Sequence, residues 1–134
     1  DEALKMMREE GLDNIFLRHN KHKLAMSNAV KALNLKLFAD EKYLSPSITA
    51  IKTEGIDAEV FRKKIKNNFD ILLAGGQDHL KGKIFRVGHL GYVNDRDIIT
   101  VVSAISNTLL DLGKISSQQA GEALAVVSRY LDRN

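Results

Sequence analysis

Apolar side chains recur at helical spacing near the start of the chain, before any other pattern appears. They predict a short amphipathic helix over residues 1–10, a break at Gly11, and a second helix from about Asp13 to Leu33. On one side of that second helix lie Ile15, His19, Met26, Ala29, Val30 and Leu33. This stripe is wide enough to face a core.

The last forty residues predict two more helices with clear ends. Asn94 is placed to cap the first of them, with Asp97 three residues on, and Gly113 ends it. Ser116 and Gln119 have the spacing of a capping box that starts the last helix. The expected apolar stripes are Ile98, Val101, Val102, Ile105, Leu109 and Leu112 in the first, and Ala120, Leu124, Val127 and Leu131 in the second.

Between these helices the pattern changes to short apolar runs rich in β-branched residues, which favours strands. The predicted strands are residues 35–39, 48–53, 69–74 and 84–88. A helix capped by Asp57 and running through residue 68 separates the first pair from the second. The order predicts an α+β domain, in which a small, mainly antiparallel sheet is covered on one face by helices.

Composition places the chain among ordinary globular domains. Its 134 residues are enough for one domain with a real core, and 44% are hydrophobic. No apolar run has the length of a membrane span, and the first residues lack the architecture of a signal peptide. The absence of cysteine excludes disulfides and thiolate metal sites within the chain and fits a cytoplasmic location.

The net charge of +3 is mild, and the basic residues do not form a nucleic-acid motif. The runs Lys21-His22-Lys23 and Lys63-Lys64-Ile65-Lys66 are local clusters with acidic residues scattered among them. Nucleic-acid binding usually needs a basic stripe on a recognised module. We therefore interpret these clusters as solvated helix faces, and expect neither a nucleic acid nor a membrane as partner.

The residues between 75 and 91 include the strongest candidates for a binding site. Strand alternation places Phe85 and Val87 on one side and Arg86 on the other, so Arg86 points away from a core that takes its neighbours. A guanidinium can hold a carboxylate or phosphate by two-point contact. The alternative is an ordinary strand arginine paired with a surface acid. The possible site-shaping residues around it are Gly75, Gly76, Gln77, Gly88, His89 and Gly91, whose glycines would admit sharp turns or a close ligand or domain.

Other candidate sites are weaker. Residues 76–83 superficially suggest a phosphate loop, but the spacing is wrong and Ile84 stands where Ser or Thr is needed. His19 and His22 are three residues apart on a helix, yet no third metal ligand is identifiable, so we expect no metal. His89 is either packed and hydrogen-bonded or within reach of a substrate. An ordinary turn residue is the better interpretation of Gln77.

Several segments resemble one known family. They are residues 75–77 (GGQ), residues 83–91 (KIFRVGHLG), residues 10–14 (EGLDN) with 17–19 (LRH), and residues 43–50 (YLSPSITA). Together they are similar to the C-terminal domain of class V, fold-type I, pyridoxal-phosphate aminotransferases, above all the alanine–glyoxylate and serine–glyoxylate (serine–pyruvate) enzymes. Some relatives carry a soluble-hydrogenase-subunit label, but a chain without cysteine has no thiolate for an iron–sulfur or nickel–iron centre.

The resemblance implies a role for Arg86, whose position in that family binds the substrate α-carboxylate. It also implies that residues 1–134 are the small C-terminal domain of a longer, homodimeric enzyme. That parent would use pyridoxal phosphate to move an amino group from alanine- or serine-like donors to glyoxylate or another small 2-oxo acid.

The family's large domain is absent from this sequence, and with it the Schiff-base lysine, the acid that pairs with the pyridine nitrogen and most of the phosphate cup. We therefore expect the isolated fragment to contain no catalytic residue, to bind no cofactor and to be inactive. Two alternatives stay open from the residues alone. One is a stand-alone regulatory module that binds an anion through Arg86, and the other is a structural assembly domain.

Overall fold

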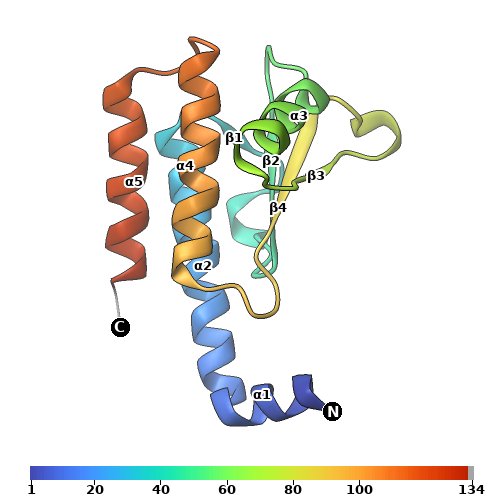
Figure 1. Ribbon diagram of the computed structural model, residues 1–134, viewed down its shortest axis with the longest axis vertical. Helices are drawn as coiled ribbons and strands as arrows, with labels where there is room; N and C mark the ends of the chain where they lie inside the picture. The colour runs from blue at the N-terminus through green and yellow to red at the C-terminus, as the bar shows by residue number, and fades with distance from the viewer. Residues whose placement is uncertain (133–134) are drawn as a thin grey trace.

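The structure is a computed structural model that describes residues 1–132 (Figure 1). Its helices are α1 (Glu2–Glu10), α2 (Leu12–Ala32), α3 (Ala58–Phe69), α4 (Asp95–Asp111) and α5 (Ser117–Leu131). Its strands are β1 (Lys36–Leu37), β2 (Ile48–Lys52), β3 (Ala74–Gly75) and β4 (Ile84–Gly88), with short 3₁₀ turns at Glu41–Tyr43 and Asp78–Leu80. The predicted order of helices and strands is confirmed.

The four strands form one antiparallel sheet in the order β1-β2-β4-β3. β4 lies between β2 and β3, so both of its edges are hydrogen-bonded. Helices α2, α3 and α4 pack on one side of the sheet, and α5 lies beyond them against α2 and α4 (Figure 1). The predicted α+β class, with helices on one face of the sheet, is confirmed.

The core fills the space between the sheet and this helical layer. The rings of Phe61 on α3 and Phe85 on β4 lie with their centroids 5.1 Å apart, in a tilted arrangement that aromatic pairs favour. Around them are fully buried side chains from every layer, namely Met26, Leu33, Ile51, Ile65, Ile98, Ile105 and Leu109. The sheet is therefore held to the helices by apolar packing along its inner face.

The predicted helix starts are confirmed in detail. The Asp57 carboxylate accepts from the backbone N–H groups of Glu59 and Val60. Asn94 forms a complete capping box with Asp97, and Ser116 forms another with Gln119. These caps satisfy backbone donors that the first turn of a helix leaves free, so short local motifs fix three helix starts.

Two of the predicted strands are wrong in extent. Residues 69–74 were expected to be a strand, but Phe69 ends α3, Asp70 takes a left-handed conformation, and only Ala74–Gly75 pair with β4. The carbonyl of Leu73 instead accepts from Arg62 Nε at 2.8 Å, so a side chain replaces the strand partner there. Likewise, only residues 36–37 of the predicted strand 35–39 are in the sheet.

The apolar stripe of α5 is buried less evenly than the sequence predicts. Val127 is fully buried, whereas Leu124 is only partly buried at the margin of the core, so its predicted burial is wrong. We expect Val127→Ala to lower the free energy of unfolding by about 2–3 kcal/mol, because it removes two buried methyl groups and leaves a cavity. Leu124→Ala should cost at least about 1 kcal/mol less, although it removes more atoms. Urea denaturation of both variants tests this order, and a larger loss for Leu124→Ala would contradict it.

Candidate functional site

Arg86 lies in the middle of β4 and faces away from the core. It stands opposite Ala50 on β2 and Ala74 on β3. Its neighbours Phe85 and Val87 are buried, while the Arg86 side chain is half-buried on the other face of the sheet. Both of these strand partners have small side chains, and the predicted alternation is confirmed.

One hydrogen bond fixes the orientation of this arginine. Arg86 Nε donates to the carbonyl of Gly75 at 3.0 Å. No acidic side chain of residues 1–132 pairs with Arg86, so the interpretation as an arginine neutralised by a surface acid is wrong for this chain. The two terminal Nη groups have no hydrogen-bond partner within residues 1–132. Such a fork suits a carboxylate or a phosphate.

Groups of this chain lie close to where a Cβ would be at both Gly75 and Gly76; at Gly75 they are the ends of movable side chains, and at Gly76 the closest is backbone. At Gly75 a Cβ would lie 2.6 Å from Arg62 Nη1 and from Glu59 Oε1 on α3. At Gly76 it would lie 2.1 Å from the carbonyl oxygen of Leu80, at the end of the Asp78–Leu80 turn. The close approach that the sequence predicts here is therefore internal.

Gly88 and Gly91 differ from that pair and from each other. Gly91 has φ +83°, which requires a glycine-like backbone. Gly88 has no such φ, and a Cβ built on it would meet no atom within 4 Å. Gly88 is two residues from Arg86 and so shares its face of the sheet. Nothing in the described chain demands a glycine at 88, and the space beside Arg86 is open.

His89 is packed inside the protein, and both of its ring nitrogens are hydrogen-bonded. Its Nδ1–H donates to the carbonyl of Pro46 at 3.0 Å, which leaves Nε2 to accept from the Thr49 hydroxyl at 2.9 Å. The ring is fully buried, and burial lowers the pKa of His89 from 6.5 to about 4. Neutral His89, directly after β4, is thus hydrogen-bonded both to β2 at Thr49 and to the segment before β2 at Pro46. Gln77 is exposed and comes before the Asp78–Leu80 turn, as expected of a turn residue.

A second arginine, which sequence reasoning missed, joins three separate parts of the chain. Arg18 on α2 donates from Nε and Nη2 to both carboxylate oxygens of Glu10, at 2.6 and 2.9 Å. Its Nη1 donates to the carbonyls of Gly91 and Val93, at 2.9 and 2.8 Å. The hydrogen bond from Arg18 lowers the pKa of Glu10. We call this four-bond arrangement the Arg18 latch; it connects α1, α2 and the loop after β4.

The two helical histidines have separate partners. His19 Nδ1 donates to the carbonyl of Ile15 at 2.8 Å, and His22 Nε2 pairs with Asp95 Oδ1 at 2.8 Å. Lys21 binds the other oxygen of Asp95 at 2.9 Å, so α2 is tied to the start of α4. Burial lowers the pKa of His22. Within residues 1–132, no group of three metal-ligating side chains is placed to hold an ion.

A Schiff-base site for pyridoxal phosphate needs a lysine inside a cavity, and the described residues do not supply one. Every lysine of the chain is exposed or only half-buried. The most covered of them are Lys21, Lys23, Lys52 and Lys64, and Lys21 is paired with Asp95. These residues alone therefore do not supply the buried lysine that a Schiff-base linkage to the cofactor needs.

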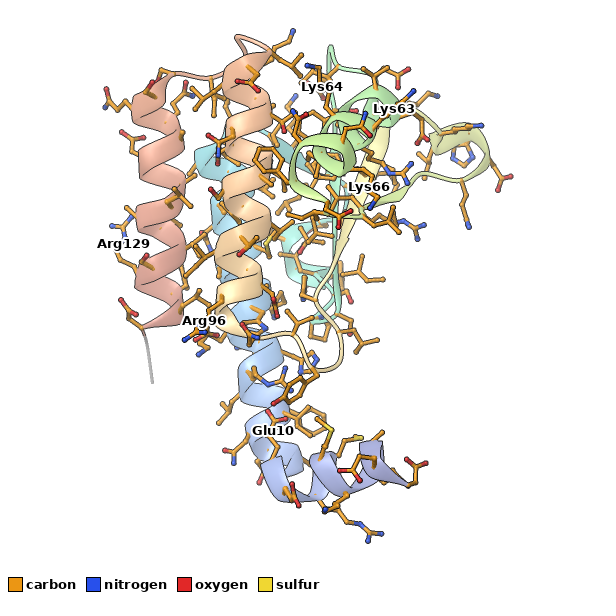
Figure 2. All side chains as sticks on the ribbon, in the orientation of Figure 1. Glu10, Lys63, Lys64, Lys66, Arg96 and Arg129 are labelled. Atoms are coloured by element: carbon orange, nitrogen blue, oxygen red, sulfur yellow. The ribbon has the colours of Figure 1, made fainter. Side chains whose placement is uncertain are left out.

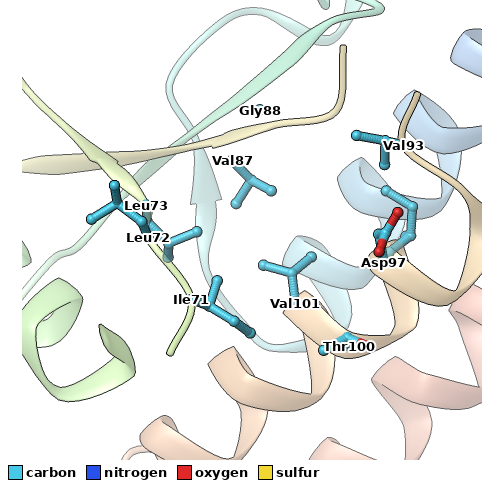
Figure 3. A pocket seen from close by; sticks show the side chains of 10 residues that line it. Ile71, Leu72, Leu73, Val87, Gly88, Val93, Asp97, Thr100 and Val101 are labelled. Carbon is cyan, nitrogen blue, oxygen red and sulfur yellow. The ribbon is translucent and has the colours of Figure 1, made fainter. Parts of the chain in front are cut away.

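An apolar pocket of about 220 Å³ opens at the edge of the sheet, between α4 and the segment before β3 (Figure 3). Its walls are Ile71, Leu72, Leu73, Val87, Val93, Ile98 and Val101, with Gly88, Asp97 and Thr100. The Asp97 carboxylate accepts from the backbone N–H of Asn94 in the capping box. The Thr100 hydroxyl donates to the carbonyl of Arg96 at 2.7 Å, so both polar side chains of the pocket bond within α4 and its cap.

The basic cluster on α3 has the solvated character that the sequence predicts. Lys63 and Lys66 are exposed and Lys64 is half-buried, and Figure 2 shows them on the surface of α3. Lys66 pairs with Asp70.

As for membranes, none of the helices within residues 1–132 combines the length and the apolar character that crossing a bilayer takes.

Comparison with known proteins places this arrangement in context. No protein-family model matches the chain. The small subunit of a soluble hydrogenase from Synechococcus sp. (strain PCC 6716) is 51% identical over 129 residues, which are 96% of this chain and 33% of that protein. A serine–glyoxylate aminotransferase from Methylorubrum extorquens is 34% identical over 136 residues, 99% of this chain and 33% of the relative.

Comparison of the fold with solved structures also finds glyoxylate aminotransferases. The crystal structure of a ureidoglycine–glyoxylate aminotransferase from Bacillus subtilis matches with a TM-score of 0.87 and 31% identity, over 96% of this chain and 34% of that one. The chain thus spans about a third of the length of the relatives that it matches. It belongs with the class V aminotransferases of the serine– and alanine–glyoxylate type, as a segment homologous to about one third of such a protein.

Proposed function

We propose that residues 1–134 are the C-terminal small domain of a pyridoxal-phosphate-dependent aminotransferase, and that Arg86 binds the carboxylate of its substrate. The observation that carries this proposal is the state of Arg86: its Nε is held by Gly75, and its Nη groups have no acidic partner among the described residues. A guanidinium fixed at one edge loses less rotational freedom when an anion binds at the other.

The open space at Gly88 supports the same role. A substrate bound at Arg86 lies against the outer face of β4, where a side chain at position 88 would project. Ala50 and Ala74, the strand partners of Arg86, are also small. The described residues thus supply charge recognition and room, and the cofactor and its electron-sink chemistry belong to the rest of the parent protein.

The relatives suggest the substrate class. Their names specify serine, (S)-ureidoglycine or L-aspartate as amino donors and glyoxylate as acceptor. For the parent of this chain we propose an alanine- or serine-like donor and glyoxylate or another small 2-oxo acid as acceptor. A homodimeric parent in the cytoplasm, and an isolated fragment that binds no cofactor and is inactive, stay predictions.

The test is substitution of Arg86 in the full-length parent. Arg86→Lys keeps the charge but loses the planar fork, so we expect kcat/KM for amino acid and oxo acid to fall about tenfold. Arg86→Gln should cost about a hundredfold, since a hydrogen bond to a charged group contributes about 1.5–3 kcal/mol. Steady-state kinetics with an amino acid, and in parallel with a simple amine that has no carboxylate, measure both effects.

The matched control is Arg96→Lys, because Arg96 is exposed on α4 and serves no predicted site. We expect it to leave the kinetics and the cofactor absorbance unchanged. Cofactor absorbance should also survive both changes at Arg86. If amine and amino acid lose activity equally, Arg86 supports structure and the carboxylate assignment has to be dropped.

The free fork of Arg86 also suits a stand-alone anion-binding module. Titration of the isolated chain with small carboxylates separates the two functions, because specific binding without the rest of the parent would favour the module. Concentration-dependent association of the isolated chain without ligand binding would favour an assembly domain instead.

A further inference from the structure

The orientation of Arg86 depends on the position of one backbone carbonyl. Arg86 Nε donates to the carbonyl of Gly75, which is the last residue of β3. β3 has only two residues and lies at the end of the strand order β1-β2-β4-β3. Most strands are longer than this, so β3 has few ladder hydrogen bonds to hold it. Contacts from outside the sheet must therefore help to fix Gly75.

Arg62 on α3 supplies the first of these contacts. Its Nε donates to the carbonyl of Leu73, directly before β3, at 2.8 Å. Its Nη1 donates to Glu59 Oε2, one turn earlier on α3, also at 2.8 Å. The Arg62 side chain is 23% exposed, and a planar guanidinium bonded along two of its edges has little freedom to turn. Arg62 thus joins α3 to the start of β3.

The same ion pair also lies against Gly75. A Cβ built on Gly75 would lie 2.6 Å from Arg62 Nη1 and 2.6 Å from Glu59 Oε1. Glu59 Oε1 is buried and has no hydrogen-bond partner within residues 1–132, so Arg62 is the side chain that holds this carboxylate. Because Glu59 balances the charge of Arg62, the cation left without an acidic partner near Gly75 is Arg86.

α3 also holds the far end of the segment that contains Gly75. The backbone N–H of Ala58, the first residue of α3, donates to the carbonyl of Gly82 at 2.9 Å. The segment from Leu73 to Gly82 is therefore bonded to α3 at both ends, through Arg62 at one and Ala58 at the other. The position of the Gly75 carbonyl is set by α3 as well as by β4.

We propose that Arg62 is a positioning residue for Arg86: it holds the β3 segment so that the Gly75 carbonyl keeps the Arg86 guanidinium turned toward the substrate carboxylate. This inference rests on the proposed function, since it assumes that Arg86 binds that carboxylate. Without the bond from Arg62, the Leu73 carbonyl takes a water and the two-residue strand can shift. Arg86 then samples more orientations, and each substrate that binds has to restrict them.

The test is Arg62→Met in the full-length parent, which keeps an unbranched side chain but removes the guanidinium. We expect KM for both amino acid and oxo acid to rise about tenfold while kcat changes less than about twofold, because binding is lost and chemistry is not. A simple amine without a carboxylate should keep its kcat/KM, and the cofactor absorbance should be unchanged. The matched control is Lys63→Met, since Lys63 is the next residue of α3 and is exposed (Figure 2).

A double variant shows whether Arg62 acts through Arg86. Once Arg86→Gln has removed the guanidinium, Arg62→Met should lower kcat/KM for the amino acid by less than about twofold more. A further tenfold loss in the double variant would overturn the proposal. So would equal losses for amine and amino acid in Arg62→Met, because a general loss of structure affects both.

Arg62→Lys provides a second test if Arg62→Met does not fold. It keeps a cation beside Glu59, but one ammonium lacks the fork that reaches Leu73 and Glu59 together, so we expect a rise in KM of about threefold with the same selectivity for carboxylates. An unchanged KM in this variant would also overturn the proposal.

The two assignments fail in different ways. If Arg86→Gln affects amine and amino acid alike, the carboxylate role of Arg86 is wrong and the role of Arg62 falls with it. If Arg86→Gln is selective for the amino acid and the Arg62 variants are not, only the positioning role of Arg62 is wrong.

Discussion

Gly76→Ala is expected to destabilise the chain by about 3 kcal/mol or more, at the upper end of what overpacking costs. The added Cβ would lie 2.1 Å from the carbonyl oxygen of Leu80, and a backbone atom cannot rotate away as a side chain can. That carbonyl already accepts from the N–H of Lys83 at 3.0 Å, so the whole turn from Leu80 to Lys83 has to move with it. Urea denaturation followed by circular dichroism measures the loss.

Gly88→Ala is the matched control for this change. A Cβ at position 88 meets no atom within 4 Å, and Gly88 has no positive φ. We expect its free energy of unfolding to differ from that of the unchanged chain by less than about 0.5 kcal/mol, or to rise slightly because the unfolded chain loses freedom. Similar losses for the two variants would contradict the assignment of the clash at Gly76.

His89→Leu is expected to cost about 2–5 kcal/mol, because it leaves the buried Thr49 hydroxyl and the part-buried carbonyl of Pro46 without a partner. The Pro46 carbonyl and the Thr49 hydroxyl both bond to the ring, and each unsatisfied group costs about 1–3 kcal/mol. Thr49→Val alone should cost less, and the double variant should cost less than the sum, since one unpaired hydroxyl is then removed. A double-mutant cycle in urea measures the coupling, and strict additivity would show that the 2.9 Å bond does not matter to stability.

The same histidine predicts how stability depends on pH. The pKa of His89 is about 4 in the folded chain, below the 6.5 of an ordinary histidine. Above pH 6.5 the ring is neutral in both states and carries no penalty. As pH falls from 6.5 to 4, only the unfolded chain takes up the proton, so the free energy of unfolding drops by up to about 1.4 kcal/mol per pH unit and levels off below pH 4.

Other titratable groups also change the pH dependence of the free energy of unfolding, and the direction of each pKa shift gives the direction of the change. His22 has a lowered pKa as well, so it adds to the loss of stability on the acid side of 6.5. Glu10 is an acid with a pKa lowered from 4.5, so its stabilisation is present above pH 4.5 and is lost as pH falls below that value. His89→Leu should therefore flatten the profile between pH 6.5 and 4 without abolishing the slope. An unchanged slope in that variant would contradict the lowered pKa.

The helix starts could be predicted from sequence because their causes are local. A cap such as Asn94 or Ser116 acts within three residues of itself, so its spacing is visible in the chain. The strand expected at 69–74 could not be corrected in this way. The apolar run at 71–73 has the composition of a strand, and only the reach of Arg62 from α3 to the Leu73 carbonyl shows that the backbone is satisfied otherwise.

In the candidate site, too, features with a local cause could be predicted and features that depend on distant contacts could not. The direction of Arg86 followed from alternation along one strand, which needs no knowledge of the fold. The reason for Gly76 did not, because the clash comes from Leu80 once the Asp78–Leu80 turn has formed. Arg18 was missed as well: its acceptors Gly91 and Val93 are more than seventy residues away, and no spacing rule connects them.

The Arg18 latch has a mechanical consequence. Turning α1 about Gly11 would break two charge-assisted bonds to Glu10, and swinging the first turns of α2 away would break the bonds to the carbonyls of Gly91 and Val93. The bend at Gly11 is thus locked, although glycine is the residue usually associated with a hinge. A displacement of α1 would therefore reach the loop that follows β4, the strand that carries Arg86, through this one guanidinium.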